Sequence, residues 1–371
     1  MIGRKRKMKV IQASFGQIAN QTVDSFTLIN DHGIELTTIN YGCILTKIIT
    51  PDKQGNYENI VLGYDTLLEY LENNSFFGAV CGRVAGRIKA GAFELDGQSY
   101  SLAKNDNGNH LHGGIKGFDK VIWDTVVIEN EQEIGVQFLY ISPDGEEGYP
   151  GKLALKVTYT LNNHNELSIS YSGQSNQKTL LNVTNHSYFN LSGNLKRDIL
   201  NHSLKIKSEN FLELDNELLP TGRFLNVENT PFDFNNGRLI KSAVTSTHPQ
   251  NLLAGNGYDH PFLLTKNEDS EIVLKDSETG RTLTIETDEV SVVVYSGNSI
   301  SPEGEIRGVP SRKHLGICLE TQGLPDAIHH SHFPSCILDK DKEYSSVTKY
   351  RFGVTKSKDN CGNNKVKEEK I

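Results

Sequence analysis

A run of alternating polar residues around His186 is the first segment whose residue types can do chemistry. If residues 181–191 form a strand, alternate side chains point to one side of it. That side then carries Asn182, Thr184, His186, Tyr188 and Asn190. A sugar site needs such amides to hydrogen-bond the hydroxyl groups of the sugar, and it needs an aromatic ring that stacks against the sugar. A hydrogen-bonded histidine in the core explains the pattern equally well, so this segment alone leaves both interpretations open.

The second segment surrounds Glu320. Alternation places Leu315, Ile317 and Leu319 on one side of a strand. The opposite side carries Gly316, Cys318, Glu320 and Gln322. The small residues before Glu320 leave room above the sheet for a ligand. A carboxylate at the end of an apolar strand is costly unless it is paired or used, although a solvent-exposed strand end or a structural ion pair is the alternative.

Histidines recur in two further places and raise the question of a metal. His110 and His112 are spaced so that a strand would place both rings on one side, as a metal pair requires. A second group is His329, His330 and His332. Zinc needs a third or fourth ligand at a characteristic spacing, and the cysteines do not supply one. We therefore expect no metal, because histidine-rich loops are more often polar surface.

Arg83, Arg87 and Asp259 are weaker candidates. The two arginines share a face by alternation, and a guanidinium is a good multiple donor to hydroxyl and ring oxygens. Either arginine can equally be a surface cation. Asp259 precedes an apolar strand, where a turn-forming aspartate is the simpler interpretation.

Short strands must position these residues. The dominant pattern is period-two alternation broken by Gly, Asn and Asp, which predicts an all-β chain folded as a large antiparallel β-sandwich or barrel. Clear examples are residues 34–39, 92–102 with an Asp-Gly hairpin turn, 153–161 followed by 166–172, 272–275, 282–286 and 289–295. Residues 66–73 favour two helical turns.

Composition limits the class of protein. The chain has 371 residues and a net charge of −8, which disfavours a nucleic-acid partner. No apolar run approaches the ~18 residues of a membrane span, so we expect no membrane partner. Five cysteines without a C-x-x-C pair favour reduced thiols and a cytoplasmic location.

The pattern also sets expected domain boundaries. Residues 1–9 form a basic N-terminal extension, residues 10–355 form one β-sandwich domain, and residues 356–371 form a charged tail expected to be disordered. A length of 371 residues allows two or three domains. However, the candidate residues extend from Arg87 to Glu320 and make sense only if they meet in one site.

Taken together and in order, these motifs resemble those of the aldose 1-epimerase family, also called galactose mutarotases. The resemblance spans residues 10–355. The matching segments are Gly82-Arg83-Val84-Ala85-x-Arg87-Ile88, Leu111-His112-Gly113-Gly114, Gly117-Phe118-Asp119-Lys120, Asp144-Gly145-Glu146-Glu147-Gly148-Tyr149-Pro150-Gly151, Thr184-Asn185-His186-Ser187-Tyr188-Phe189-Asn190-Leu191, Tyr258-Asp259-His260-Pro261-Phe262, Leu319-Glu320-Thr321-Gln322 and Pro325-Asp326-Ala327.

The resemblance implies the family's supersandwich fold, with the sugar on its open face, and a role for each site residue. His186 falls on the general acid and Glu320 on the general base, while Arg87, His112 and Asp259 fall on residues that hold the sugar. It implies a monosaccharide substrate, no cofactor and no metal; we expect a monomer or a homodimer. Three departures bear on substrate preference. Gly86 stands where Asn is common, His110 stands where Ser is common, and Val293 stands where some members carry a sugar-contacting Gln.

The acid role predicts a pKa for His186 near or above neutrality, which a nearby carboxylate such as Asp259 would support. Three rival functions stay open at this point. A glycosidase would use two carboxylates, for which Asp259 and Glu320 are the candidates. A non-catalytic sugar-binding module would need neither His186 nor Glu320. A hexose-6-phosphate epimerase would need additional basic residues for the phosphate.

Overall fold

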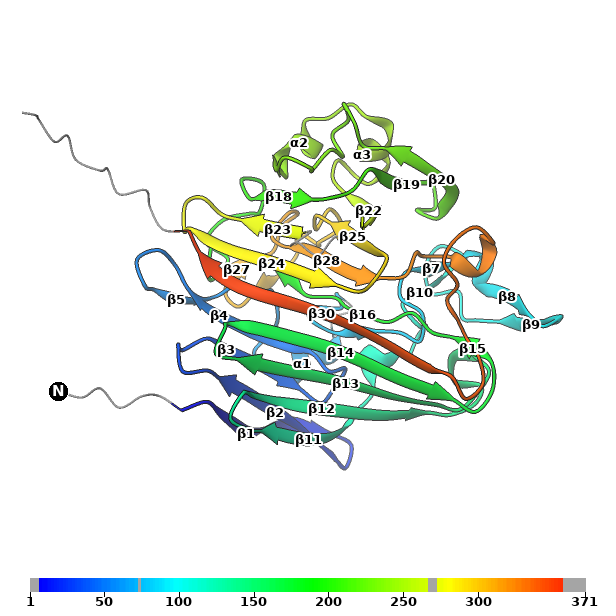
Figure 1. The fold of residues 1–371 in the computed structure, drawn as a ribbon, viewed down its shortest axis with the longest axis horizontal. Helices are drawn as coiled ribbons and strands as arrows, with labels where there is room; N and C mark the ends of the chain where they lie inside the picture. Colours follow the sequence, from blue (N-terminus) through cyan, green and yellow to red (C-terminus); the bar gives the residue numbers. More distant parts are fainter. Residues whose placement is uncertain (1–6, 73–74, 266–271, 356–371) are drawn as a thin grey trace, which may run out of the picture.

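A computed structural model describes residues 7–72, 75–265 and 272–355, which form antiparallel sheets packed face to face (Figure 1). The predicted basic extension lies mostly, and the predicted charged tail entirely, outside the described residues. No helix within the described ranges is long and apolar enough to cross a membrane.

The largest sheet has nine strands and runs across the whole molecule (Figure 1). In spatial order they are β11 (Asp124–Glu129), β12 (Glu133–Ser142), β13 (Leu153–Asn162), β14 (Glu166–Ser175), β30 (Glu343–Val354), β24 (Arg281–Thr287), β23 (Ile272–Lys275), β18 (Ser203–Ile206) and β21 (Arg238–Leu239). Strand β30 pairs with β14 on one side and with β24 on the other. The last strand of the described residues thus joins the two halves of this sheet.

A six-stranded sheet carries much of the candidate site. Its strands, in spatial order, are β17 (Tyr188–Phe189), β28 (Ile317–Gln322), β25 (Ser291–Tyr295), β22 (Asp259–Leu263), β19 (Asn210–Leu214) and β20 (Pro220–Asn226). Strand β25 lies between β22 and β28, in a register that places Asp259 opposite Tyr295 and Val293 opposite Glu320. The pairing therefore brings Asp259 and Glu320, 61 positions apart in the numbering, to two strands separated by one.

A five-stranded sheet and several small ones complete the fold. The five strands are β1 (Lys9–Ile18), β2 (Gln21–Ile29), β3 (Glu35–Ile39), β4 (Leu45–Pro51) and β5 (Tyr57–Asn59). The two-stranded pairs are β6 (Val80–Cys81) with β16 (Thr184–Asn185), β7 (Arg87–Ile88) with β10 (His110–Leu111), β8 (Ala92–Leu95) with β9 (Gln98–Ser101), β15 (Thr179–Leu180) with β29 (Ile337–Leu338), and β26 (Glu305–Ile306) with β27 (Val309–Pro310). The α-helices found in the described ranges are α1 (Leu67–Glu72), α2 (Lys241–Val244) and α3 (Pro249–Leu253).

One hydrophobic core is shared by all three large sheets. It includes Phe138 and Leu155 from the nine-stranded sheet, Leu36 from the five-stranded sheet, and Phe262 and Ile317 from the six-stranded sheet, all almost fully buried. Alternate residues of β13 and β14 point into this core, as the sequence pattern predicts. The predicted all-β sandwich is confirmed, and so are the 92–102 hairpin and the short helix after Thr66.

Residues 181–191 do not form one continuous strand, which was the condition for their shared polar face. This segment contains only two short strands, β16 and β17, which pair with different neighbours: β16 with β6 and β17 with β28. Local side-chain bonds explain the interruptions, because the Asn185 side-chain oxygen accepts from the Ser187 backbone N–H and that of Asn190 accepts from the Ser192 N–H. Such bonds compete with the regular strand ladder.

Candidate active site

A cavity of about 470 Å³ opens on the six-stranded sheet, and all five predicted site residues line it. They are Arg87, His112, His186, Asp259 and Glu320. The volume lies in the range of small-molecule sites. Strand pairing has therefore gathered, around one cavity, residues that are spread over 234 positions of the chain.

His186 sits in the short link between β16 and β17. Its backbone N–H donates to the carbonyl of Ala79, and its own carbonyl accepts from the N–H of Gly78. Two aromatic rings lie against the imidazole, that of Tyr188 at 5.0 Å and that of Phe76 at 5.9 Å between ring centroids. Backbone and ring contacts together fix the direction in which the imidazole points.

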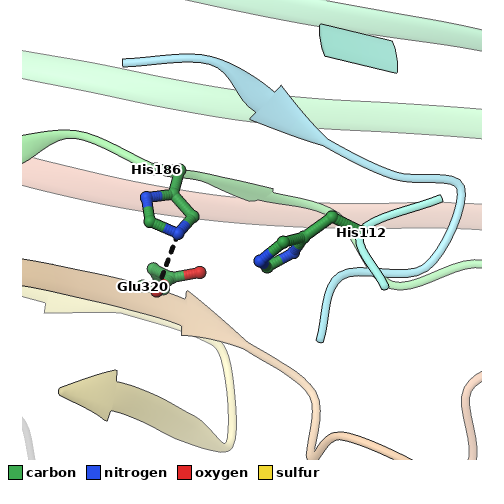
Figure 2. Close-up of side chains that lie close together, drawn as sticks. All are labelled: His112, His186 and Glu320. Carbon is green, nitrogen blue, oxygen red and sulfur yellow. Dashed lines mark ion pairs between the residues drawn. The ribbon is translucent and has the colours of Figure 1, made fainter. Parts of the chain in front are cut away.

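Glu320 lies on β28 and faces His186, as Figure 2 shows. Its Oε1 is 3.5 Å from Nε2 of His186, and both side chains are almost completely buried. Cys318, two residues earlier on the same strand, is buried with its Sγ 3.4 Å from Nδ1 of His186. The predicted alternation on this strand is confirmed, since Glu320 and Gln322 both line the cavity.

The expectation that the pKa of His186 stays near or above neutrality is wrong. Burial lowers the pKa of His186 to about 4. Burial also raises the pKa of Glu320 well above its usual range, and the nearby Asp259 raises it further while Arg87 opposes the rise. Low-dielectric surroundings penalise both charged forms, so the free site favours a neutral imidazole beside a protonated carboxyl group over an ion pair.

Arg87 and Asp259 flank this pair. The Nε of Arg87 donates to Oδ2 of Asp106 at 2.7 Å, which orients the guanidinium at the cavity wall. Asp259 begins β22, and burial raises the pKa of its carboxyl group, with Arg87 acting in the opposite direction. The cavity thus offers one guanidinium and two carboxyl groups, Asp259 and Glu320, to a polar ligand.

His112 faces the same cavity from the end of β10 (Figure 2), and its hydrogen-bond partner shows which ring nitrogen carries the proton. The N–H of Gly86 donates to Nδ1 of His112 at 3.2 Å. Burial, together with the nearby His186 and Arg87, lowers the pKa of His112 well below its usual value. A neutral ring that accepts at Nδ1 carries its proton on Nε2, so His112 is a hydrogen-bond donor through that nitrogen.

This proton assignment also tests whether the site suits a metal. Three atoms that could bind a metal, one ring nitrogen each from His112 and His186 and a carboxylate oxygen from Glu320, lie within 4.8 Å of one another. A metal-bound histidine coordinates through an unprotonated nitrogen and donates from its other nitrogen. In His112 the lone pair of Nδ1 is engaged by Gly86, and Nε2 carries the proton. The donor set therefore fits a polar organic ligand better than a metal ion.

Several candidates from the sequence lie elsewhere. Arg83 is buried and donates to the carbonyls of Pro150 and Gly151, so it supports a loop. Nδ1 of His110 contacts the carbonyl of Ala103, away from the cavity lining. Of the polar face predicted around His186, only His186 and Tyr188 line the cavity; the other three are buried and hydrogen-bond to backbone carbonyls: Asn182, Thr184 and Asn190.

Sequence reasoning missed Phe76 and Asp106. Phe76 contacts the rings of both His112 and His186, with a centroid distance of 4.8 Å to the former. It lies in a loop with no periodic pattern. Asp106 lies in a stretch rich in asparagine, where an aspartate is ordinarily a turn residue. Neither position carries a local signal that would have marked it.

The chain is similar to known proteins in both its sequence and its structure. The family model described as "Aldose 1-epimerase" matches residues 24–351. The galactose mutarotase of Bos taurus is 41% identical over 354 residues, covering 94% of this chain and 99% of that protein. The galactose mutarotase of Homo sapiens is 40% identical, with coverage of 93% and 99%. The crystal structure of galactose 1-epimerase from Lactobacillus acidophilus NCFM superposes with a TM-score of 0.84 at 28% identity, covering 94% of this chain and 99% of that one.

Proposed function

Because the chain belongs to the aldose 1-epimerase family, and is therefore an isomerase that interconverts the α and β anomers of an aldose, we propose that His186 is its general acid and Glu320 its general base. We propose that the substrates are free aldohexoses such as D-galactose and D-glucose. The names of the mutarotase relatives support this choice, and so do the charged and hydrogen-bonding side chains that line the cavity.

The reaction opens the hemiacetal, rotates the C1–C2 bond and closes the ring on the other face. Opening removes a proton from the C1 hydroxyl and delivers one to the ring oxygen. Glu320 takes the first proton and His186 gives the second. Closing reverses both transfers, so each group returns to its starting state. The reaction forms no covalent intermediate with the enzyme and consumes no co-reactant.

The observation that carries this assignment is the 3.5 Å between Nε2 of His186 and Oε1 of Glu320. The two oxygens that exchange protons with the enzyme are both bonded to C1 of the sugar. An acid and a base that serve them must therefore lie close together and face the same point. General acid and base groups held in this way each contribute roughly 10²–10⁴ to the rate.

The pKa shifts of His186 and Glu320 determine which of the two residues holds the transferable proton, while the pair still holds one such proton in total. One proton moved from Glu320 to Nε2 of His186 converts the neutral pair into the reactive ion pair. Because burial lowers the pKa of His186, its imidazolium is a strong acid toward the weakly basic ring oxygen. Because burial raises the pKa of Glu320, its carboxylate is a strong base toward a hydroxyl group. The reactive form is scarce and correspondingly potent.

We further propose that Arg87, His112 and Asp259 hold the sugar. His112 donates through Nε2–H, as its contact with Gly86 requires. The Nε–H of Arg87 already donates a hydrogen bond to Asp106, which leaves the two terminal nitrogens of the guanidinium to donate to sugar oxygens. A carboxylate at Asp259 accepts from hydroxyl groups. These contacts would position C1 between His186 and Glu320.

We also propose that residues 10–355 act as one domain, because β30 joins the two halves of the nine-stranded sheet. The four cysteines within the described residues are free thiols, which supports a cytoplasmic location. The net charge of −8 supports a protein without nucleic-acid or membrane partners. We propose that it works as a monomer or a homodimer.

Polarimetry on freshly dissolved α-D-glucose and α-D-galactose tests the proposal. The enzyme should accelerate the approach to anomeric equilibrium, and His186→Ala should remove the acceleration while His164→Ala, at an exposed site, should retain it. Release of a chromophoric aglycone from a glycoside would instead indicate a glycosidase. Unaccelerated mutarotation of both sugars by the folded enzyme would contradict the proposed substrates.

A further inference from the structure

The imidazole of His186 is contacted at both of its nitrogens, and the mechanism above uses only one. Nε2 faces Glu320, while Nδ1 lies 3.4 Å from Sγ of Cys318. Cys318 and Glu320 are two residues apart on β28, so their side chains project from the same side of the strand. A single strand therefore supplies the neighbour of each ring nitrogen.

The thiol of Cys318 stays protonated in this position. The side chain is fully buried, and burial raises the pKa of Cys318 well above its usual value, with the nearby carboxyl groups of Glu320 and Asp259 adding to the rise. A protonated thiol is a weak donor and a weak acceptor. Its sulfur can therefore accept a hydrogen bond from Nδ1–H without competing strongly for the proton.

We propose, on the basis of the acid role assigned above to His186, that Cys318 is a positioning residue whose sulfur accepts from Nδ1–H and so keeps Nε2 as the nitrogen that gives and takes the catalytic proton. Ring opening transfers the proton of Nε2 to the ring oxygen and leaves a neutral imidazole with its other proton on Nδ1. Ring closure returns a proton to Nε2. The Nδ1–H to sulfur contact is the same in both states.

A thiol suits this role better than the alternatives. A carboxylate at the same place would stabilise the imidazolium and make His186 a weaker acid. An alkyl group would leave Nδ1–H buried without an acceptor, or let the proton move to Nε2, which cannot then receive another from Glu320. The weak acceptor fixes the location of the proton while leaving the imidazolium acidic.

Cysteine variants test the role in kinetics. Cys318→Ala should lower kcat on D-galactose by about tenfold or more with KM changed less than about twofold, since an unpaired buried donor costs about as much as a tenfold change in rate. Cys318→Ser should recover most of the loss, because a hydroxyl oxygen also accepts. The matched control is Cys81→Ala, at a fully buried thiol on β6, with wild-type kcat expected. Equal kcat values for Cys318→Ala and Cys81→Ala would overturn the inference.

A second measurement needs no variant and no activity. In the free, ¹⁵N-histidine-labelled wild-type protein near pH 7, the imidazole signals of His186 should show a protonated Nδ1 and an unprotonated Nε2. The opposite tautomer, with the proton on Nε2, would overturn the inference even if Cys318→Ala fails to fold. An active wild-type enzyme with that opposite tautomer refutes only the role of Cys318, whereas an enzyme inactive on aldoses refutes the proposed function.

Discussion

Replacing Gly86 by alanine tests whether the close approach between residue 86 and Pro325 shapes the cavity. Gly86 has a φ of +76°, and a Cβ added there would lie 2.9 Å from Cβ of Pro325. Gly97, in the turn between β8 and β9, has a φ of +78° and no atom within 4 Å of the added Cβ. Gly97→Ala therefore reproduces the backbone strain of Gly86→Ala without its steric contact.

The expected loss of stability follows from these two terms. A left-handed conformation costs a non-glycine residue roughly 1–2 kcal/mol, and both variants bear that cost. Overpacking adds about 1–3 kcal/mol, and only Gly86→Ala bears it. We expect the free energy of unfolding in urea to fall by roughly 1–2 kcal/mol for Gly97→Ala and by roughly 2–5 kcal/mol for Gly86→Ala.

Activity should follow the same distinction. The N–H of Gly86 donates to Nδ1 of His112, so a displaced backbone at residue 86 weakens the orientation of that sugar-binding ring. We expect KM for D-galactose to rise about fivefold or more in Gly86→Ala, the equivalent of about 1 kcal/mol, and to stay at the wild-type value in Gly97→Ala. Equal losses of stability in the two variants, or an unchanged KM in a clearly destabilised Gly86→Ala, would refute the reasoning.

Three further predictions concern the groups around the pair. Asp106→Asn weakens the charged partner of Arg87 and should raise KM about fivefold with kcat nearly unchanged, which steady-state polarimetry can check; a fall in kcat alone would contradict this positioning role. The pair is active when it holds one transferable proton, so kcat/KM should fall below about pH 4, where His186 is protonated in addition to Glu320. It should fall again as the pH rises past the raised pKa of Glu320, where the pair loses that proton. A half-maximum near pH 6.5 on the acid side would contradict the burial of His186. Phe76→Ala admits water to the imidazole, so the acid limb should move to higher pH as kcat falls, and an unmoved limb would show that other groups bury His186.

The sequence predicts the regular parts of this fold because one face of each strand is buried. Residues 153–161 and 166–172 alternate strictly, and they became β13 and β14. Residues 181–191 alternate almost as well, yet they form only two short strands, β16 and β17. Alternation reports only which side chains face the same way, whereas Asn185 and Asn190 satisfy backbone groups locally and end the ladder.

The site was predictable in its residue types and not in its electrostatics. The motif order pointed to Arg87, His112, His186, Asp259 and Glu320, and the structure places all five around one cavity. Their catalytic and binding roles stay predictions. Depth of burial depends on contacts from loops that carry no periodic pattern, and burial is what moves the pKa of the acid.

Proton delivery at the pair is the central claim of this account, and the rate of the Glu320→Gln variant tests it most directly.

The measurement is the α-to-β conversion of saturating D-galactose, followed by ¹H NMR, with sugar binding verified by titration on the same sample. Glutamine keeps the shape of the side chain but cannot accept the C1 hydroxyl proton, so we predict a fall of roughly 10²–10⁴ in kcat with binding retained. The matched control Glu131→Gln, at an exposed glutamate, should keep the wild-type rate. A Glu320→Gln enzyme that binds galactose and turns it over within tenfold of the wild-type rate would contradict the account.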